Sequence, residues 1–332
     1  MSNWKDIEMN GPITPYNEPF ILQRADPFVC RGADGTWYFT ASYPDYDRIL
    51  LRASDTMEGL RSAPERLIWT RHERGPMSRH IWAPEMHFVF GKWYIYFAAS
   101  EWDDMWKLRP YVLECDGDPM TGAWHELGQM QPCEGDPQSF TDFSLDATIF
   151  PWQGEYYYIW AQKASNISNL YIAKMAAPNR LGTVMVMLTT PDYDWERVDF
   201  WVNEGPACLV HDGKLYLTYS ASGTGSCYCV GMLTCDLRDD LLDPRSWRKE
   251  RWPVLGTDAE KGIYGPGHNS FVKDDEGRDI MVYHARTYDG IRTDDPLFDP
   301  NRHAHYLYVT YDAEGRPVFR VRRQGAATEA EK

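Results

Sequence analysis

The sequence predicts an all-β protein of one domain, a five-bladed β-propeller. Strand-like runs rich in Tyr, Trp, Phe and Ile recur along the 332 residues, separated by turns that contain Gly or Asp, and helical periodicity is scarce. A second observation is internal repetition, because one strand–turn–strand pattern typical of a β-hairpin occurs five times in varied form. The five copies are ADPFVCRGADGTWYFTAS (25–42), APEMHFVFGKWYIYFAAS (83–100), LDATIFPWQGEYYYIWAQ (145–162), EGPACLVHDGKLYLTYSAS (204–222) and GHNSFVKDDEGRDIMVYHA (267–285).

The spacing of the copies indicates how large each repeat is. Their second strands begin 56, 63, 59 and 65 residues apart, at Trp37, Trp93, Tyr156, Leu215 and Ile280. Further strand material follows each hairpin, such as RILLRAS after the first and RPYVLEC after the second, so each repeat fits a four-stranded antiparallel sheet. Five such sheets arranged radially form a five-bladed propeller. Two tandem β-sandwiches are the alternative, but no Pro/Ser-rich linker or change of composition divides the chain.

The domain boundaries follow from the repeats. We expect an N-terminal extension over residues 1–21, the propeller over 22–322 and a C-terminal tail over 323–332. The stretches 71–85 and 131–144 are interpreted as insertions between blades.

Composition excludes several classes of partner. With 43% hydrophobic and 14% aromatic residues the chain can bury a large core. A net charge of −15 repels nucleic acids and anionic membrane surfaces. The N-terminal residues lack a basic and then apolar segment, so we expect a cytoplasmic protein with no membrane association. Seven cysteines without a C-x-x-C pair indicate unpaired thiols. The sequence predicts no oligomeric state.

The candidate site lies where the first strand of each repeat begins. The alignment places a polar residue there in every repeat, within one position: Asp26, Glu85, Asp146, Glu204 and His268. First strands line the channel of a propeller, so these side chains should converge at one end of its axis. Carboxyl groups brought close together raise one another's pKa values, which separates a proton donor from a proton acceptor. Taken singly, Asp26, Asp146 and Glu204 each have an alternative interpretation as turn residues, but three acids in one register favour a site.

Other residues near these positions allow more than one interpretation. Glu85 lies one residue deeper and is expected to form hydrogen bonds near the channel wall. Trp82 could be a core residue, but a Trp close to a Pro at the entrance of a strand favours a platform for stacking on a sugar. His268, between Gly267 and Asn269, could bind a metal, plug the channel or contact substrate. His303 and His305 have the spacing of one strand face but no evident third ligand, so they are interpreted as strand residues.

The motifs RADPFV, IWAPEMHFVFGKWYIYFAA, SLDATIF, NEGPACL and GPGHNSF…VYHAR together resemble glycoside hydrolase family 43, from about residue 22 to residue 320. The resemblance implies a five-bladed propeller that hydrolyses arabinofuranosides or xylosides with inversion. It implies Asp26 as general base, Glu204 as general acid and Asp146 as the aspartate that orients and tunes the acid. It also implies that Arg286 binds the sugar and that a structural calcium ion lies in the axial channel beside His268, while the chemistry itself needs no cofactor.

Within the family, the sequence around IWAPE, TDFSLDAT, NEGPA, TYSAS and YGPGHNSF is most similar to that of exo-acting α-L-arabinofuranosidases. The resemblance therefore implies α-1,5-linked arabino-oligosaccharides as substrates. A β-xylosidase or a bifunctional enzyme would use the same three acids. A non-catalytic sugar-binding propeller is disfavoured, since it would not need the pair of proton donor and acceptor.

Overall fold

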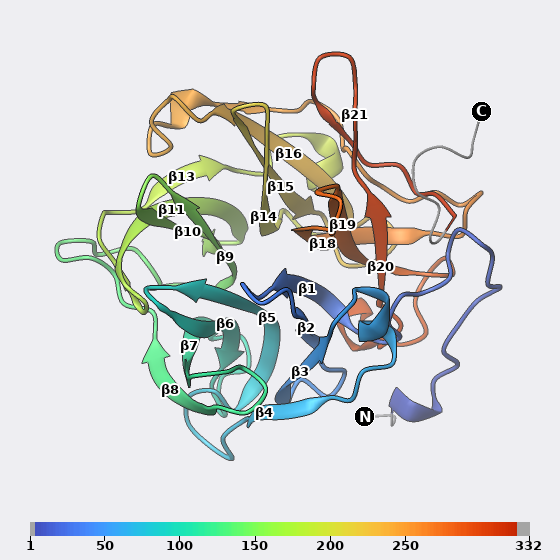
Figure 1. Ribbon diagram of the computed structural model, residues 1–332, viewed down its shortest axis with the longest axis horizontal. Coiled ribbons are helices and arrows are strands. Elements are labelled where there is room, and N and C mark those ends of the chain that lie inside the picture. Colours follow the sequence, from blue (N-terminus) through green and yellow to red (C-terminus); the bar gives the residue numbers. More distant parts are fainter. Residues whose placement is uncertain (1–3, 324–332) are drawn as a thin grey trace.

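The computed structural model describes residues 4–323 and shows five antiparallel sheets arranged around a central axis (Figure 1), which confirms the predicted all-β propeller. Strands β1, β5, β9, β14 and β18 lie innermost, one in each blade. No helix in this part of the chain is long and apolar enough to cross a membrane. The predicted extension 1–21 is described only from residue 4, and all of the predicted tail beyond Arg323 lies outside the described residues.

Four blades contain four or more strands. Their strands are β1 (Ala25–Arg31), β2 (Trp37–Ser42), β3 (Arg48–Ser54) and β4 (Arg66–Thr70) in blade 1; β5 (Arg79–Val89), β6 (Lys92–Ser100), β7 (Arg109–Asp116) and β8 (Ala123–Gln129) in blade 2; β9 (Ser144–Trp152), β10 (Glu155–Ala164), β11 (Ile167–Ala177), β12 (Arg180–Leu181) and β13 (Val186–Thr189) in blade 3; and β14 (Asn203–His211), β15 (Lys214–Ala221), β16 (Cys229–Asp236) and β17 (Trp247–Lys249) in blade 4.

Blade 5 differs from the expected four strands. It has three, β18 (Tyr264–Lys273), β19 (Asp279–Arg286) and β20 (His303–Tyr308), and the chain then forms a separate hairpin of β21 (Thr310–Tyr311) and β22 (Pro317–Val318). At the outer edge of β20, Ala304 forms an antiparallel bridge with Ile21. The residues just before β1 therefore close the ring by adding to blade 5.

Short 3₁₀ helices occur in the connections, and one predicted insertion is shorter than expected. Because β5 already begins at Arg79, only residues 71–78 of the stretch 71–85 are loop, whereas 131–144 remains a connection up to β9. The helices are η1 (Trp4–Asp6), η2 (Glu58–Arg61), η3 (Asp194–Glu196), η4 (Pro244–Ser246) and η5 (Pro296–Phe298).

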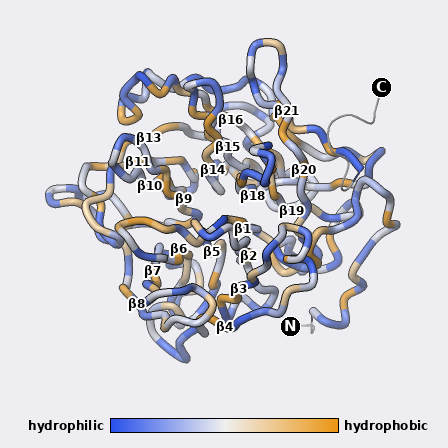
Figure 2. Tube along the Cα trace, viewed as in Figure 1, coloured by the Kyte–Doolittle hydropathy of each residue, from blue (hydrophilic) through white to orange (hydrophobic). Residues whose placement is uncertain are grey.

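Alternation along the strands explains why the blades stack. In β15, Leu215, Leu217 and Tyr219 face one neighbouring blade, where they pack with β10 residues such as Ile159. Tyr216 points to the opposite face and packs with Met281 of blade 5. Since successive side chains in a strand point to opposite faces, a strand buried between two sheets is apolar on both. Figure 2 shows these apolar segments in the blades and hydrophilic residues in many of the outer loops.

A backbone irregularity recurs at the start of the innermost strands. Asp26, Ala83, Asp146, Gly205 and His268 all have left-handed φ values, between 44° and 55°, and each lies where the pairing with the second strand shifts register. A β-bulge re-aims side chains, and non-glycine residues with positive φ often mark functional sites. The equivalent positions of the five blades are therefore these residues. Glu85 lies two residues after its equivalent position, rather than the expected one, and Glu204 lies one residue before its equivalent position.

All seven cysteines are unpaired, as predicted. They are buried or half-buried, which matches the expectation of thiols that pack in the core.

The lowered pKa values of four buried histidines predict that the free energy of unfolding decreases in acid. Burial lowers the pKa of His80 and His303 to about 4 and that of His284 and His305 to about 3. Below the unfolded-state pKa of about 6.5 the unfolded chain binds protons that the folded chain does not, so stability is lost as pH falls. Each histidine contributes up to about 1.4 kcal/mol per pH unit to the fall in the free energy of unfolding. His268, whose pKa is raised, contributes in the opposite direction.

Urea unfolding at pH 7, 6 and 5 measures this dependence. We expect the free energy of unfolding to fall steeply toward pH 5, and less steeply in His305→Gln. Replacing His125, whose side chain is 59% exposed, by Gln should leave the slope unchanged. A free energy of unfolding that does not change between pH 7 and 5 would contradict the prediction.

Candidate active site

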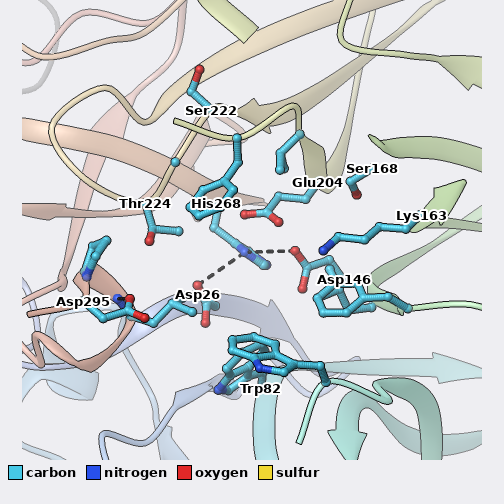
Figure 3. A pocket seen from close by; sticks show the side chains of 18 of the residues that line it. Asp26, Trp82, Asp146, Lys163, Ser168, Glu204, Ser222, Thr224, His268 and Asp295 are labelled. Carbon is cyan, nitrogen blue, oxygen red and sulfur yellow. Dashed lines mark hydrogen bonds and ion pairs between the residues drawn. The ribbon is translucent and has the colours of Figure 1, made fainter. Parts of the chain in front are cut away.

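A cavity of about 360 Å³ opens at the end of the channel where the innermost strands begin. Asp26, Asp146, Glu204 and His268 all line it (Figure 3), so the structure brings together the three predicted acids and the predicted histidine. They come from four different blades, through β1, β9, β14 and β18. The aromatic and apolar residues of the wall include Trp82, Trp106, Phe143, Phe200 and Leu297, and polar residues such as Lys163 and Arg302 complete it.

Asp26 is held in its ionised form. Its Oδ2 accepts a hydrogen bond of 2.5 Å from Ser42, and its Oδ1 lies 3.3 Å from His268 Nδ1 and 3.6 Å from Arg302 Nη1. Burial by itself raises the pKa of Asp26, but the charges of His268 and Arg302 and a hydrogen bond with His284 hold it below its usual range. The carboxylate can therefore accept a proton at neutral pH.

The pKa values of Asp146 and Glu204 are shifted in the opposite direction to that of Asp26. The backbone N–H of Gly205, next to Glu204, donates to Asp146 Oδ2 at 3.2 Å. Burial raises the pKa of Asp146 well above its usual range, and the charges of Glu204 and Asp26 add to this. Burial also raises the pKa of Glu204, against a hydrogen bond from Tyr228. Both carboxyl groups therefore retain a proton to higher pH than a free carboxyl group does. Donor and acceptor carboxyl groups therefore face the same cavity.

His268 joins the two sides of the site. Its Nδ1 lies 3.3 Å from Asp26 and 3.6 Å from Asp146, the two contacts drawn as dashed lines in Figure 3. Burial lowers the pKa of His268, but the surrounding charges of Asp146, Asp26 and Glu204 raise it above its usual value overall. The imidazole thus acts as a positive partner between acids that would otherwise repel one another.

The resemblance implies a calcium ion held beside His268 through water molecules, and the described side chains form no direct ligand set for it. Calcium prefers six to eight oxygen ligands, whereas the described residues 4–323 contain no group of three His, Cys, Asp or Glu side chains suited to a metal ion. The Nδ1 atom of His268 also faces carboxylates rather than an open position. The calcium ion stays a prediction, and no step below depends on it.

Trp82 lines the cavity and is 8% exposed. Its indole stacks on His80, with ring centroids 4.2 Å apart, and meets Tyr46 edge-on. Its buried Nε1 has no hydrogen-bond partner within the described part of the chain. The indole of Trp82 therefore both packs in the core and borders the cavity. Its contact with a sugar stays a prediction.

Arg286 does not lie in the cavity wall as its predicted sugar contact requires. It is 1% exposed, and its guanidinium donates to the carbonyl oxygens of Thr224 and Pro296 at 2.7 Å each. Both acceptors line the cavity, so Arg286 connects two segments of the cavity wall through hydrogen bonds without lining the cavity itself. The arginine that lines the cavity is Arg302, which sequence reasoning missed.

The position of Arg302 follows from the strand register of blade 5. Ala285 pairs with His303 in the antiparallel pair of β19 and β20, so Arg286 at the end of one strand and Arg302 just before the other lie at the same end of the blade. His284, whose Nδ1 accepts a 3.1 Å hydrogen bond from the backbone N–H of Asp26, was also missed.

Glu85 lies away from the cavity. Its Oε2 is 2.8 Å from His87 Nε2, and both residues line a second cavity of about 250 Å³ further along the channel. The expected hydrogen bonding of Glu85 near the channel wall is therefore observed.

The model of the family Glycosyl hydrolases family 43 matches residues 16–317. The chain belongs to glycosyl hydrolase family 43. In this family member the three acids that the motifs predicted all line the cavity at the end of the channel.

Several known proteins are similar to this family 43 chain. It is 46% identical over 316 residues to the "Extracellular exo-alpha-(1->5)-L-arabinofuranosidase" of Streptomyces avermitilis, covering 94% of this chain and 64% of that protein. It is 47% identical over 279 residues to a protein of the same name from Streptomyces chartreusis, covering 82% of this chain and 83% of that protein. The crystal structure of an α-L-arabinofuranosidase from Lactobacillus brevis superposes with a TM-score of 0.85 at 47% identity, over 92% of this chain and 96% of that one. The chain thus spans less than two thirds of the Streptomyces avermitilis relative.

Proposed function

We propose that this chain is an exo-acting, inverting α-L-arabinofuranosidase that releases terminal arabinose from α-1,5-linked arabino-oligosaccharides. The observation that carries the proposal is one cavity bordered by an ionised carboxylate, Asp26, and by Asp146 and Glu204, whose pKa values burial raises. The names of the two Streptomyces relatives support the choice of substrate.

The mechanism follows from the different protonation of the acids. Glu204 gives its proton to the glycosidic oxygen as the bond from that oxygen to the anomeric carbon breaks. Asp26 takes a proton from a water molecule whose oxygen bonds to the opposite face of the same carbon. When Asp146 is ionised, its negative charge raises the pKa of Glu204 and so favours the protonated acid.

The products of arabinobiose and of a longer linear α-1,5-arabinan test this function. We expect arabinose as the only early product from the polymer, and proton NMR before mutarotation should show the β-anomer first, because inversion converts an α-linkage into a β-product. Initial release of the α-anomer would overturn the inverting mechanism. Faster hydrolysis of p-nitrophenyl xylopyranoside than of p-nitrophenyl arabinofuranoside would instead assign the chain as a xylosidase.

The role of Asp146 predicts a change in pH dependence. Asp146→Asn removes a negative charge beside Glu204, so the pKa of Glu204 should fall and the alkaline limb of the pH–rate profile should move to lower pH. Measuring kcat/KM for arabinobiose from pH 4 to 9 gives the shift. As a matched control, Asp275→Asn changes an exposed aspartate in the β18–β19 hairpin and should leave the profile unchanged. An unmoved alkaline limb in a stably folded Asp146→Asn protein would show that this aspartate does not tune the acid.

The cellular compartment also stays a prediction. The names of both Streptomyces relatives include the word extracellular. The seven unpaired thiols of this chain favour a reducing compartment such as the cytoplasm.

A further inference from the structure

One buried tyrosine contacts the acid from behind. Tyr228 lies directly before β16, is 1% exposed, and does not line the cavity. Its hydroxyl donates a hydrogen bond of 2.8 Å to Oε1 of Glu204.

The tyrosine ring is held in one position by blade 5. It lies parallel to the ring of His284, with centroids 5.6 Å apart and an interplanar angle of 1°. On another side it contacts Gly267, where an added Cβ would lie only 2.3 Å from a ring carbon of Tyr228. A side chain at position 267 would therefore displace the tyrosine, and the present packing fixes the direction of its hydroxyl.

The hydrogen bond distinguishes the two oxygens of Glu204. Oε1 accepts from Tyr228, and the carbonyl oxygen of a protonated carboxyl group is its better acceptor, so this contact favours the proton on Oε2. Building on the function proposed above, we propose that Tyr228 is a positioning residue, which orients Glu204 so that Oε2 carries the proton transferred to the leaving oxygen. When that proton leaves, Glu204 becomes a carboxylate and keeps the hydrogen bond from Tyr228, which is stronger to a charged acceptor.

This role predicts the direction in which the alkaline limb of the pH–rate profile moves when the hydroxyl of Tyr228 is removed. Burial raises the pKa of Glu204, and the hydrogen bond from Tyr228 opposes that rise. Without the hydroxyl the pKa of Glu204 should rise further, so the alkaline limb should move to higher pH. Asp146→Asn should move the same limb in the opposite direction, so the two variants separate the effects of charge and hydrogen bonding.

The test compares Tyr228→Phe with Tyr216→Phe. Tyr216 is buried to the same extent in the same blade, but its hydroxyl donates to the carbonyl oxygen of Gly315, away from the acids. For Tyr228→Phe we expect kcat on arabinobiose to fall about tenfold, in line with the loss of one hydrogen bond, with KM nearly unchanged and the alkaline limb shifted upward. Tyr216→Phe should keep the wild-type profile.

The outcomes separate this proposal from the function on which it rests. A wild-type protein without activity on arabinofuranosides overturns the proposed function. An active wild-type protein, with a Tyr228→Phe variant whose alkaline limb is unmoved or moves downward, overturns only the role of Tyr228. A lower melting temperature together with an unmoved limb leads to the same conclusion, because it assigns Tyr228 to packing alone.

Discussion

Glu204→Gln is expected to lower kcat on arabinobiose by about 10³-fold, the middle of the range for general acid catalysis. An amide has the shape of the carboxyl group but cannot donate the proton that the leaving sugar oxygen needs. Activity on p-nitrophenyl arabinofuranoside should fall much less, because p-nitrophenolate departs without protonation. Initial rates on the two substrates, compared in one buffer, measure this difference.

A matched control is available in blade 3. Glu155 is an exposed glutamate at the start of β10, and Glu155→Gln makes the same chemical change away from the cavity. It should retain wild-type rates on both substrates. Wild-type turnover of arabinobiose by Glu204→Gln would remove this residue from the role of acid.

Asp26→Asn is expected to lower kcat by about 10³-fold on both arabinobiose and the aryl substrate. The attacking water must lose a proton whatever the leaving group is, so a good leaving group does not compensate for the missing base. The asparagine still accepts a hydrogen bond from Ser42, whose hydroxyl lies 2.5 Å from Asp26 Oδ2, so the fold should persist. Steady-state rates on both substrates and a melting curve test the expectation.

The pattern across the two substrates is the discriminating result for Asp26. If Asp26→Asn lost activity on arabinobiose but retained it on the aryl substrate, the residue would serve the leaving group and could not be the base. Early-time proton NMR of the residual activity adds an independent check, because the product formed by inversion remains the β-anomer.

Local patterns in the sequence were sufficient to predict the five hairpins and the three acids of the site. Alternating apolar residues and Gly/Asp turns depend on neighbours a few positions away, so five hairpins and their order could be predicted. Asp26, Asp146 and Glu204 fall within one position of each other in the repeat alignment, and the structure places all three at one cavity. The family was also predicted correctly from these motifs.

The sequence by itself thus determined the all-β repeat architecture and the three acids, since both depend on short-range pattern. Only the tertiary structure decided the bulges that offset Glu85 and Glu204, and the closure of blade 5 by Ile21. It also decided that Arg302 rather than Arg286 borders the cavity, and that Tyr228 contacts the acid. These features depend on contacts between residues far apart in the chain, such as Asp26 with Arg302, whose geometry is set by how whole blades pack against one another.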